Sequence, residues 1–177
     1  MHEKLAVELE RLLDELTNGA EPMETSTLAR IGENIAKAFK VQPDEVAVLA
    51  KVGNDKFLKF ILPEKLQMIG TIPLTSMTAL AARTAREKKP EVINDFTNAR
   101  HASVFEGVPL GRRHDELIHK IMSAPIMMNN EVVGVVQVSR KGRTARDAGP
   151  DFSRKDLMNL TALSHLLSRF IKLCQVA

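Results

Sequence analysis

The sequence contains no tryptophan, no tyrosine and only one cysteine, Cys174, among its 177 residues. A single thiol excludes an internal disulfide and any zinc or redox site built from several cysteines. The 7 phenylalanines supply all of the aromatic side chains, so the chain offers few platforms on which single-stranded bases could stack. The net charge of +3 is also too small to indicate nucleic acid as a partner.

Long apolar runs are absent as well. No stretch approaches the roughly 20 apolar residues that span a bilayer, so we expect no membrane partner. The N-terminal residues, MHEKLAVELE, are acidic and amphipathic, whereas a secretory signal is basic and then apolar. Together with the lone cysteine, these features predict a cytoplasmic protein. The composition, 44% apolar and 27% charged, is typical of a folded globular domain.

Apolar residues at helical spacing predict three amphipathic helices. In residues 3–17 the apolar stripe consists of leucines, Leu5, Leu9, Leu12, Leu13 and Leu16. A second helix is expected from about Thr25 to Phe39, and a third over 154–174, where Ser153 and Asp156 resemble a capping box. The stripe of the third helix is wider than one contact needs. We therefore expect it to pack against a sheet on one side and another helix on the other.

Between these helices the apolar period changes to that of strands. EVAVLAKV and KFLKFILP flank Gly53-Asn54-Asp55, which favours a hairpin. IMSAPIMM and EVVGVVQVS flank Asn129-Asn130, and pairing of residue 128 with 131 would place residue 122 opposite 137. Both faces of this second pair are largely apolar, which predicts central strands covered on both sides.

The middle of the chain is less regular. Ser76 is expected to cap a helix over 77–87, and EVIND indicates a short strand. Residues 96–114 show no clean period and predict a long, partly helical connection, a kind of segment that often carries function.

The order of these elements and several local strings resemble a GAF domain. The matching strings are IGTIPLTSMTALAARTAREKKPEVINDF, IHKIMSAPIMMNNEVVGVVQVSRK and DFSRKDLMNLTALSHLL, within roughly residues 25–174. The resemblance implies an α+β fold with an antiparallel sheet of five to six strands and the N- and C-terminal helices packed on one face. Irregular segments would form a pocket on the other face. We accordingly expect an amphipathic helix and linker over 1–24 and the domain itself over 25–177.

The resemblance also allows Cys174 and residues 139–157 to be compared with the motifs of the family's enzymatic and ligand-binding branches. One branch of the family reduces methionine sulfoxide with two cysteines, and bilin-binding members attach their chromophore to a pocket cysteine. Cys174 lies near the end of an amphipathic helix, where a small buried hydrophobe is expected. Cyclic-nucleotide-binding members carry Asn-Lys, then Phe and Asp-Glu, whereas this chain has Ser139-Arg140, Phe152 and Asp156-Leu157. That pattern favours a clamp from Arg140 or Lys141 to Asp156 over cyclic-nucleotide recognition.

Two further patterns could bind ions or polyanions. His114 and His119 are five residues apart, so they diverge on a helix instead of sharing a face as zinc-protease histidines do. His101 could add a ligand only if its loop folded back. Arg140, Lys141, Arg143 and Arg146 could contact phosphates, but they have no interleaved aromatics. We expect no metal site, no catalytic residues and a solvated basic loop.

By the order of elements in the family, six side chains are expected around one ligand pocket. These are Thr78, Asn94, Asp95, Phe105, His114 and Ser123. They would give a mostly apolar cavity with a few convergent polar groups, and the cofactor or ligand is unknown. Asp95 could bind a ligand or cap the following turn.

Two hypotheses for the function follow from this pattern. The first is a non-catalytic sensory or regulatory module that binds a small molecule and acts in signal transduction. The second is a dimerisation or interaction module whose pocket is filled by its own side chains. In either case the helices over 3–17 and 154–174 are expected to pack side by side and to continue across a two-fold axis. Leu9, Leu13, Leu160 and Leu167 would lie in or near that homodimer interface.

Overall fold

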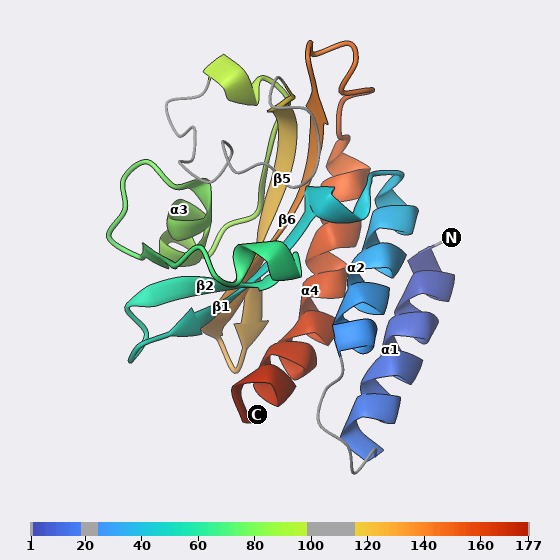
Figure 1. The fold of residues 1–177 in the computed structure, drawn as a ribbon, viewed down its shortest axis with the longest axis vertical. Coiled ribbons are helices and arrows are strands. Elements are labelled where there is room, and N and C mark those ends of the chain that lie inside the picture. The colour runs from blue at the N-terminus through green and yellow to red at the C-terminus, as the bar shows by residue number, and fades with distance from the viewer. Residues whose placement is uncertain (1, 19–24, 99–115, 177) are drawn as a thin grey trace.

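The computed structural model describes residues 2–18, 25–98 and 116–176, and Figure 1 shows how their helices and strands are arranged. The α-helices are α1 (His2–Asn18), α2 (Thr25–Phe39), α3 (Leu80–Glu87) and α4 (Arg154–Val176). The strands are β1 (Val46–Val52), β2 (Phe57–Leu62), β3 (Thr71–Pro73), β4 (Glu91–Ile93), β5 (Leu117–Met128) and β6 (Glu131–Gly142). Short 3-10 helices are η1 (Pro43–Glu45), η2 (Glu64–Leu66) and η3 (Phe96–Asn98). No helix within these described ranges is long and apolar enough to span a bilayer.

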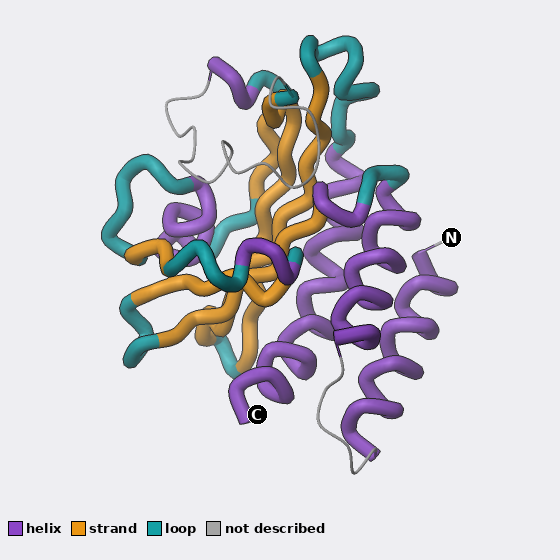
Figure 2. The backbone as a smooth tube through the Cα atoms, viewed as in Figure 1, coloured by secondary structure: helices purple, strands orange, loops and turns teal. Residues whose placement is uncertain are grey.

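The strands form one six-stranded sheet in the order β3-β2-β1-β6-β5-β4. All of its pairings are antiparallel. The longest strands, β5 and β6, lie in its middle beside β1 (Figure 2), and the edge strands β3 and β4 are short. Short edges present few unpaired backbone groups to solvent. The predicted α+β fold with a five- to six-stranded antiparallel sheet is confirmed.

The β5–β6 hairpin turns at Asn129-Asn130, as predicted, and both residues have positive φ. Met128 pairs with Glu131, but the register shifts between Ile126 and Met127. Met122 therefore lies opposite Val138, not opposite residue 137 as uniform pairing predicted. The irregularity lies next to Gly134, where a Cβ atom would collide with the carbonyl oxygen of Leu49 and with the side chain of Ile171.

One face of the sheet carries the helical layer. In Figure 1, α4 lies along β5 and β6, α2 crosses the β1–β2 side, and α1 packs outermost against α2 and α4. The predicted side-by-side packing of α1 and α4 is thus present within one chain, and an ion pair from Arg169 to Asp14 spans it at 2.9 Å. Leu9, Leu13, Leu160 and Leu167 are all buried in the core that the helices form with one another and with the sheet.

The other face of the sheet is covered by α3, η2 and the β3 region. Leu49 and Val135 of the central strands pack there against Ala82 and Leu66. The central strands are thus buried on both faces, as their sequence predicted. The helix α3 begins at Leu80, three residues later than predicted, because the hydroxyl of Ser76 accepts a hydrogen bond from the backbone of Ala79 and holds the preceding turn.

The connection from β6 to α4 is exposed over residues 143–147, as expected of a solvated basic loop, and side chains hold the end of it that leads into α4. Lys120 donates to the carbonyl oxygen of Gly149 at 2.6 Å and contacts Asp151 at 2.7 Å. The predicted capping box of α4 is present, since Ser153 and Asp156 bond each other's backbone N–H groups. The end of the loop that leads into α4 is therefore fixed.

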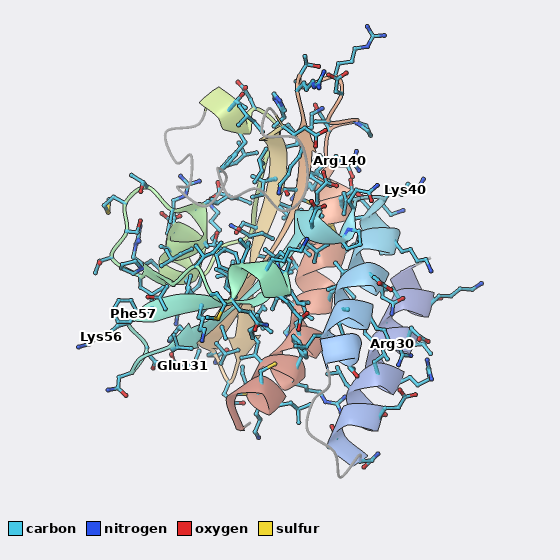
Figure 3. The ribbon with its side chains drawn as sticks, viewed as in Figure 1. Arg30, Lys40, Lys56, Phe57, Glu131 and Arg140 are labelled. Carbon is cyan, nitrogen blue, oxygen red and sulfur yellow. The ribbon has the colours of Figure 1, made fainter. Side chains whose placement is uncertain are left out.

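Arg140 joins the helical layer to this connection, and Figure 3 places it at the upper end of β6 near the start of α4. Its guanidinium donates to the carbonyl oxygens of Phe39 and Pro150 and stacks on the ring of Phe152, 4.4 Å from the centroid. Burial lowers the pKa of Arg140, while the nearby Asp156 charge acts in the opposite direction. The expected clamp therefore rests chiefly on backbone carbonyls, and Asp156 serves as the cap of α4.

Candidate functional site

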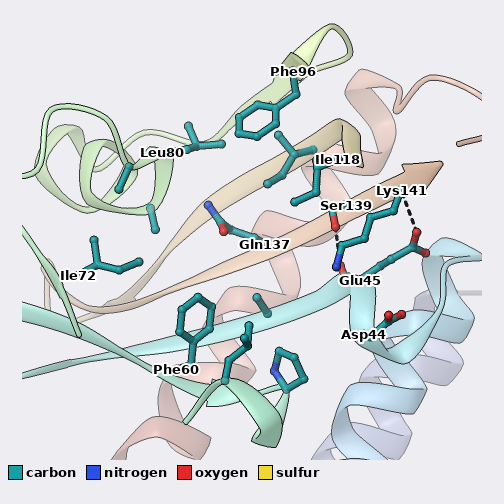
Figure 4. Close-up of a pocket in the computed structure, with 16 residues that line it drawn as sticks. Asp44, Glu45, Phe60, Ile72, Leu80, Phe96, Ile118, Gln137, Ser139 and Lys141 are labelled. Carbon is teal, nitrogen blue, oxygen red and sulfur yellow. Dashed lines mark hydrogen bonds between the residues drawn. The ribbon is translucent and has the colours of Figure 1, made fainter. Parts of the chain in front are cut away.

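A small chamber lies between the sheet and the segments that cover its second face (Figure 4). Its volume is about 70 Å³. The walls are mostly apolar and come from seven parts of the chain, so the chamber exists only in the folded domain. The side chains that line it include Phe60, Leu66, Ile72, Leu80, Phe96 and Ile121, together with the polar residues Asp44, Glu45, Gln137, Ser139 and Lys141.

Glu45 forms the acidic end of the chamber. This residue is almost fully buried, and its two carboxylate oxygens accept hydrogen bonds from the backbone N–H groups of Gln42 and Lys141, each at 2.7 Å. A buried carboxylate is costly unless such donors replace its water. The hydroxyl of Ser139 donates to the carbonyl oxygen of Glu45 at 3.3 Å. These bonds join η1 to β6 and keep this wall in place.

Gln137 projects from β6 into the apolar part of the chamber, between Leu80 and Phe60 in Figure 4. Its position follows from register, since Gln137 pairs with Ala47 on one side and Ser123 on the other. The amide nitrogen donates to the hydroxyl of Ser123 at 3.1 Å. The structure thus places one oriented amide group in an otherwise apolar space.

Of the six residues predicted around the pocket, none of the four that the structure describes lines this chamber. Thr78 is exposed and precedes α3, so it does not lie on that helix as expected. Asn94 bonds the backbone N–H and C=O of Phe152, at 2.9 and 3.0 Å, and Asp95 is exposed. Phe105 and His114 lie outside the described residues. Ser123 is fully buried and lies behind Gln137, one hydrogen bond away from the chamber.

Sequence reasoning missed the polar residues of β6 that do line the chamber. Gln137, Ser139 and Lys141 occupy alternate positions on one strand, the spacing that places side chains on one face. Polar residues at every second position of a strand expected to be buried on both sides were the available signal. Glu45 had no comparable signal, because its role depends on contacts with residues far away in the chain.

A second hollow lies outside the chamber, between α2 and the start of η2. It has a volume of about 230 Å³ and is lined by Gly32, Glu33, Lys65 and their neighbours. Asp44 and Pro63 line both hollows, so these two residues form part of the wall between them.

The remaining candidates for catalysis or metal binding are Cys174 and the histidines. Burial raises the pKa of the Cys174 thiol to about 11, which keeps it protonated at neutral pH. His119 lies with its Nε2 atom 3.0 Å from the carbonyl oxygen of Gly142, whereas His101 and His114 lie outside the described residues. Among the residues that the structure describes, no three histidine, cysteine or carboxylate side chains are placed to hold a metal ion.

Comparison with protein families connects these observations. A family profile described as the GAF domain matches residues 6–172, which is nearly the whole chain. The chain belongs to the GAF domain family. GAF domains are regulatory and sensory modules of signalling proteins, although some proteins with this fold are enzymes. No curated protein sequence matches the chain.

Solved structures show the same fold at low sequence identity. A GAF domain from an Acinetobacter phosphoenolpyruvate-protein phosphotransferase is 17% identical, with 96% of this chain and 93% of that chain covered and a TM-score of 0.67. The corresponding domain from Coxiella burnetii is 13% identical, with coverages of 99% and 97% and a TM-score of 0.66. A free methionine-R-sulfoxide reductase from Neisseria meningitidis, solved with its substrate, is 15% identical, with coverages of 96% and 89% and a TM-score of 0.60.

Proposed function

We propose that this GAF domain is a non-catalytic cytoplasmic sensor that binds a small molecule in the chamber and acts in signal transduction as a homodimer. The observation that carries the proposal is the chamber itself, an apolar space into which Gln137 projects a polar group. Small-molecule sites combine these two features, because apolar walls supply affinity and a few polar groups fix orientation. The raised pKa of the half-buried Cys174 thiol supports the non-catalytic part, since thiol catalysis requires a thiolate.

The size of the chamber limits what it accepts. Drug-sized ligands occupy roughly 300–1,000 Å³, whereas this chamber has about 70 Å³. A ligand of a few heavy atoms fits that space. The same small volume favours the second candidate, a dimerisation module whose pocket is filled by its own side chains.

A chamber-filling variant separates the two candidates. Ala47 lines the chamber, and Ala47→Met would occupy part of it. Native mass spectrometry of protein isolated from its source should show a bound small molecule on the wild type and none on Ala47→Met. The matched control is Ala145→Met, the same substitution at an exposed position in the loop between β6 and α4. Wild-type protein without a bound molecule, together with a crystal structure showing a filled chamber, would favour the dimerisation module.

The homodimer is part of the proposal, although its contacts need to differ from those first predicted. The four predicted interface leucines are buried within the chain's own core and have little surface left for a partner. Met158 on α4 is 65% exposed and offers apolar surface on the same helix. We therefore place the proposed two-fold contact on the outer face of α4 beside α1.

A further inference from the structure

A series of hydrogen bonds runs from α3 across β5 and β6 to the chamber. Thr84 of α3 donates its hydroxyl proton to the carbonyl oxygen of Leu80 at 3.0 Å, and its oxygen lies 2.7 Å from the hydroxyl oxygen of Ser123. Ser123 in turn lies 3.1 Å from the amide nitrogen of Gln137. Thr84 and Ser123 are both buried, so water does not compete for these bonds.

Counting the available protons shows which group donates in each of these hydrogen bonds. A hydroxyl has one proton to donate, and that of Thr84 is used on Leu80. Ser123 must therefore donate to Thr84, which leaves its oxygen as the acceptor for the Nε2–H group of Gln137. The amide orientation of Gln137 is thereby fixed, with its nitrogen toward Ser123 and its carbonyl oxygen on the other side. Within the described residues, no hydrogen bond reaches that oxygen.

The hydroxyl of Ser139, like that of Ser123, uses its proton on another protein group. It donates to the carbonyl oxygen of Glu45, so its oxygen is left as an acceptor. Gln137 and Ser139 are two residues apart on β6 and line the same chamber. This stretch of β6 thus offers acceptor oxygens, set among apolar side chains such as Ile121 and Leu80.

We infer that the chamber selects a compact, uncharged, mostly apolar molecule that carries an N–H or O–H donor for the carbonyl oxygen of Gln137, with Ser123 and Thr84 as positioning residues. The inference rests on the proposed function and specifies its ligand class. A molecule with only acceptor atoms would face the Gln137 oxygen without a proton between them. A charged molecule would lose its hydration among the apolar side chains around Gln137, which is costly.

Pyrrole and furan form a matched pair of probes for this chamber. Both are five-membered aromatic rings, but pyrrole has an N–H donor where furan has an oxygen acceptor. We expect the wild-type protein to bind pyrrole about tenfold more tightly than furan, the size of effect that one net hydrogen bond gives. Binding is measured by titration of protein with isotope-labelled methyl groups, following the Ile72, Leu80 and Ile121 signals from the chamber wall.

Three variants test the role of each group. Gln137→Met removes the acceptor with little change in shape, so the preference for pyrrole should fall to within about twofold. Ser123→Ala frees the amide of Gln137 to turn its nitrogen toward the chamber, so furan should bind more tightly than it binds the wild type. Thr84→Val should also make furan bind more tightly. Without the Thr84 hydroxyl, Ser123 could donate to the carbonyl oxygen of Gln137, which would turn the amide nitrogen toward the chamber. The control is Ser164→Ala, a buried serine of α4 that bonds Thr161 and should keep the tenfold preference.

The outcomes distinguish the inference from the proposed function beneath it. Equal binding of both probes to the wild type, with shifts of the chamber methyl groups, would overturn the donor selection while leaving the chamber as a ligand site. Retention of the pyrrole preference in Gln137→Met would also overturn it. If millimolar concentrations of neither probe shift the chamber methyl groups, the proposed ligand site itself fails, and the inference fails with it.

Discussion

The carboxylate of Glu45 lies in the chamber wall, yet both of its oxygens are already used by backbone N–H groups. Each oxygen thus already has a backbone donor in place of water. Glu45 therefore acts mainly on the structure, by joining η1 to β6. Gln137 is the opposite case, since half of its amide is fixed by Ser123 and the other half faces the chamber.

Replacement of Glu45 tests its structural role. In Glu45→Gln one carboxylate oxygen becomes an NH₂ group, which must face a backbone N–H donor. Hydrogen bonds to charged groups contribute about 1.5–3 kcal/mol, and we expect a loss of that size in the free energy of unfolding, measured with urea. The control Glu33→Gln lies on the exposed face of α2 and should change stability by less than about 0.5 kcal/mol. Equal effects of the two substitutions would contradict the assignment.

Cys174 gives a prediction about pH. Burial raises the pKa of its thiol from 9.0 to about 11, so the native protein should react with iodoacetamide roughly 100-fold more slowly at pH 8 than the urea-unfolded protein does. The rate should keep increasing up to about pH 11. Because the folded state favours the protonated thiol, its contribution to stability is present below pH 9 and is lost as the pH rises toward 11.

The variant Cys174→Ser should remain folded, lack this alkaline loss and keep any ligand binding of the wild type. Rapid stoichiometric labelling of the native wild-type protein at neutral pH would instead show that the thiol is reactive.

Two glycines of the regular elements should respond in opposite ways to the same substitution. Gly134 lies where β6 meets β1 and α4, and a Cβ atom there would collide with Leu49 and Ile171. Gly134→Ala should therefore destabilise the fold by about 1–3 kcal/mol. Gly32 lies within α2, and a Cβ atom there would meet Leu62 at 3.6 Å, an ordinary contact. Gly32→Ala should stabilise the fold by about 0.5–1 kcal/mol. Thermal unfolding should give a lower midpoint than the wild type for Gly134→Ala and a higher one for Gly32→Ala.

The elements themselves could be predicted from the sequence, but their exact pairing could not. Asn129-Asn130 marked the tightest hairpin because asparagine tolerates positive φ. The register shift next to Gly134 depends on Leu49 and Ile171, which are distant in sequence. In the same way, α3 begins at Leu80 because the turn before it is closed by Ser76, whereas helical spacing alone suggested an earlier start.

At the scale of the whole molecule, the candidate site was harder to predict than the fold. Mapping by element order predicted Ser123 in the pocket wall, whereas Ser123 lies behind Gln137 and is joined to it by one hydrogen bond. The chamber is assembled from seven separate segments, and its shape depends on how their side chains pack. Periodicity reports which face of an element is apolar. It does not report which apolar residues leave a space between them.

The proposed dimer is testable without disturbing the core. Deletion of residues 1–18 would remove leucines that pack against α4, so it would unfold the helical layer as well as change assembly. Met158→Asp places a charge on the exposed surface of α4 instead. We expect the wild type to sediment as a dimer at micromolar concentration and Met158→Asp as a monomer that keeps the wild-type secondary structure. Its unfolding midpoint should fall only by the contribution of the lost association.

The control for the sedimentation experiment is Met68→Asp, because Met68 is 93% exposed and lies after η2, away from α4. This variant should sediment as the wild type does. A monomeric wild type at micromolar concentration would contradict the dimer.

The packing of α1 against α4 also has a consequence for how the protein is made. The ion pair between Asp14 and Arg169 joins residues 155 positions apart, so the leucines of α1 are synthesised long before the helix that covers them. The part of their surface that packs against α4 remains exposed on the ribosome until residues 154–176 emerge. Contacts of such long sequence separation form late and slow folding, and exposed apolar surface during that interval favours aggregation. A nascent chain stalled before α4 should therefore depend on chaperones more strongly than the finished protein does.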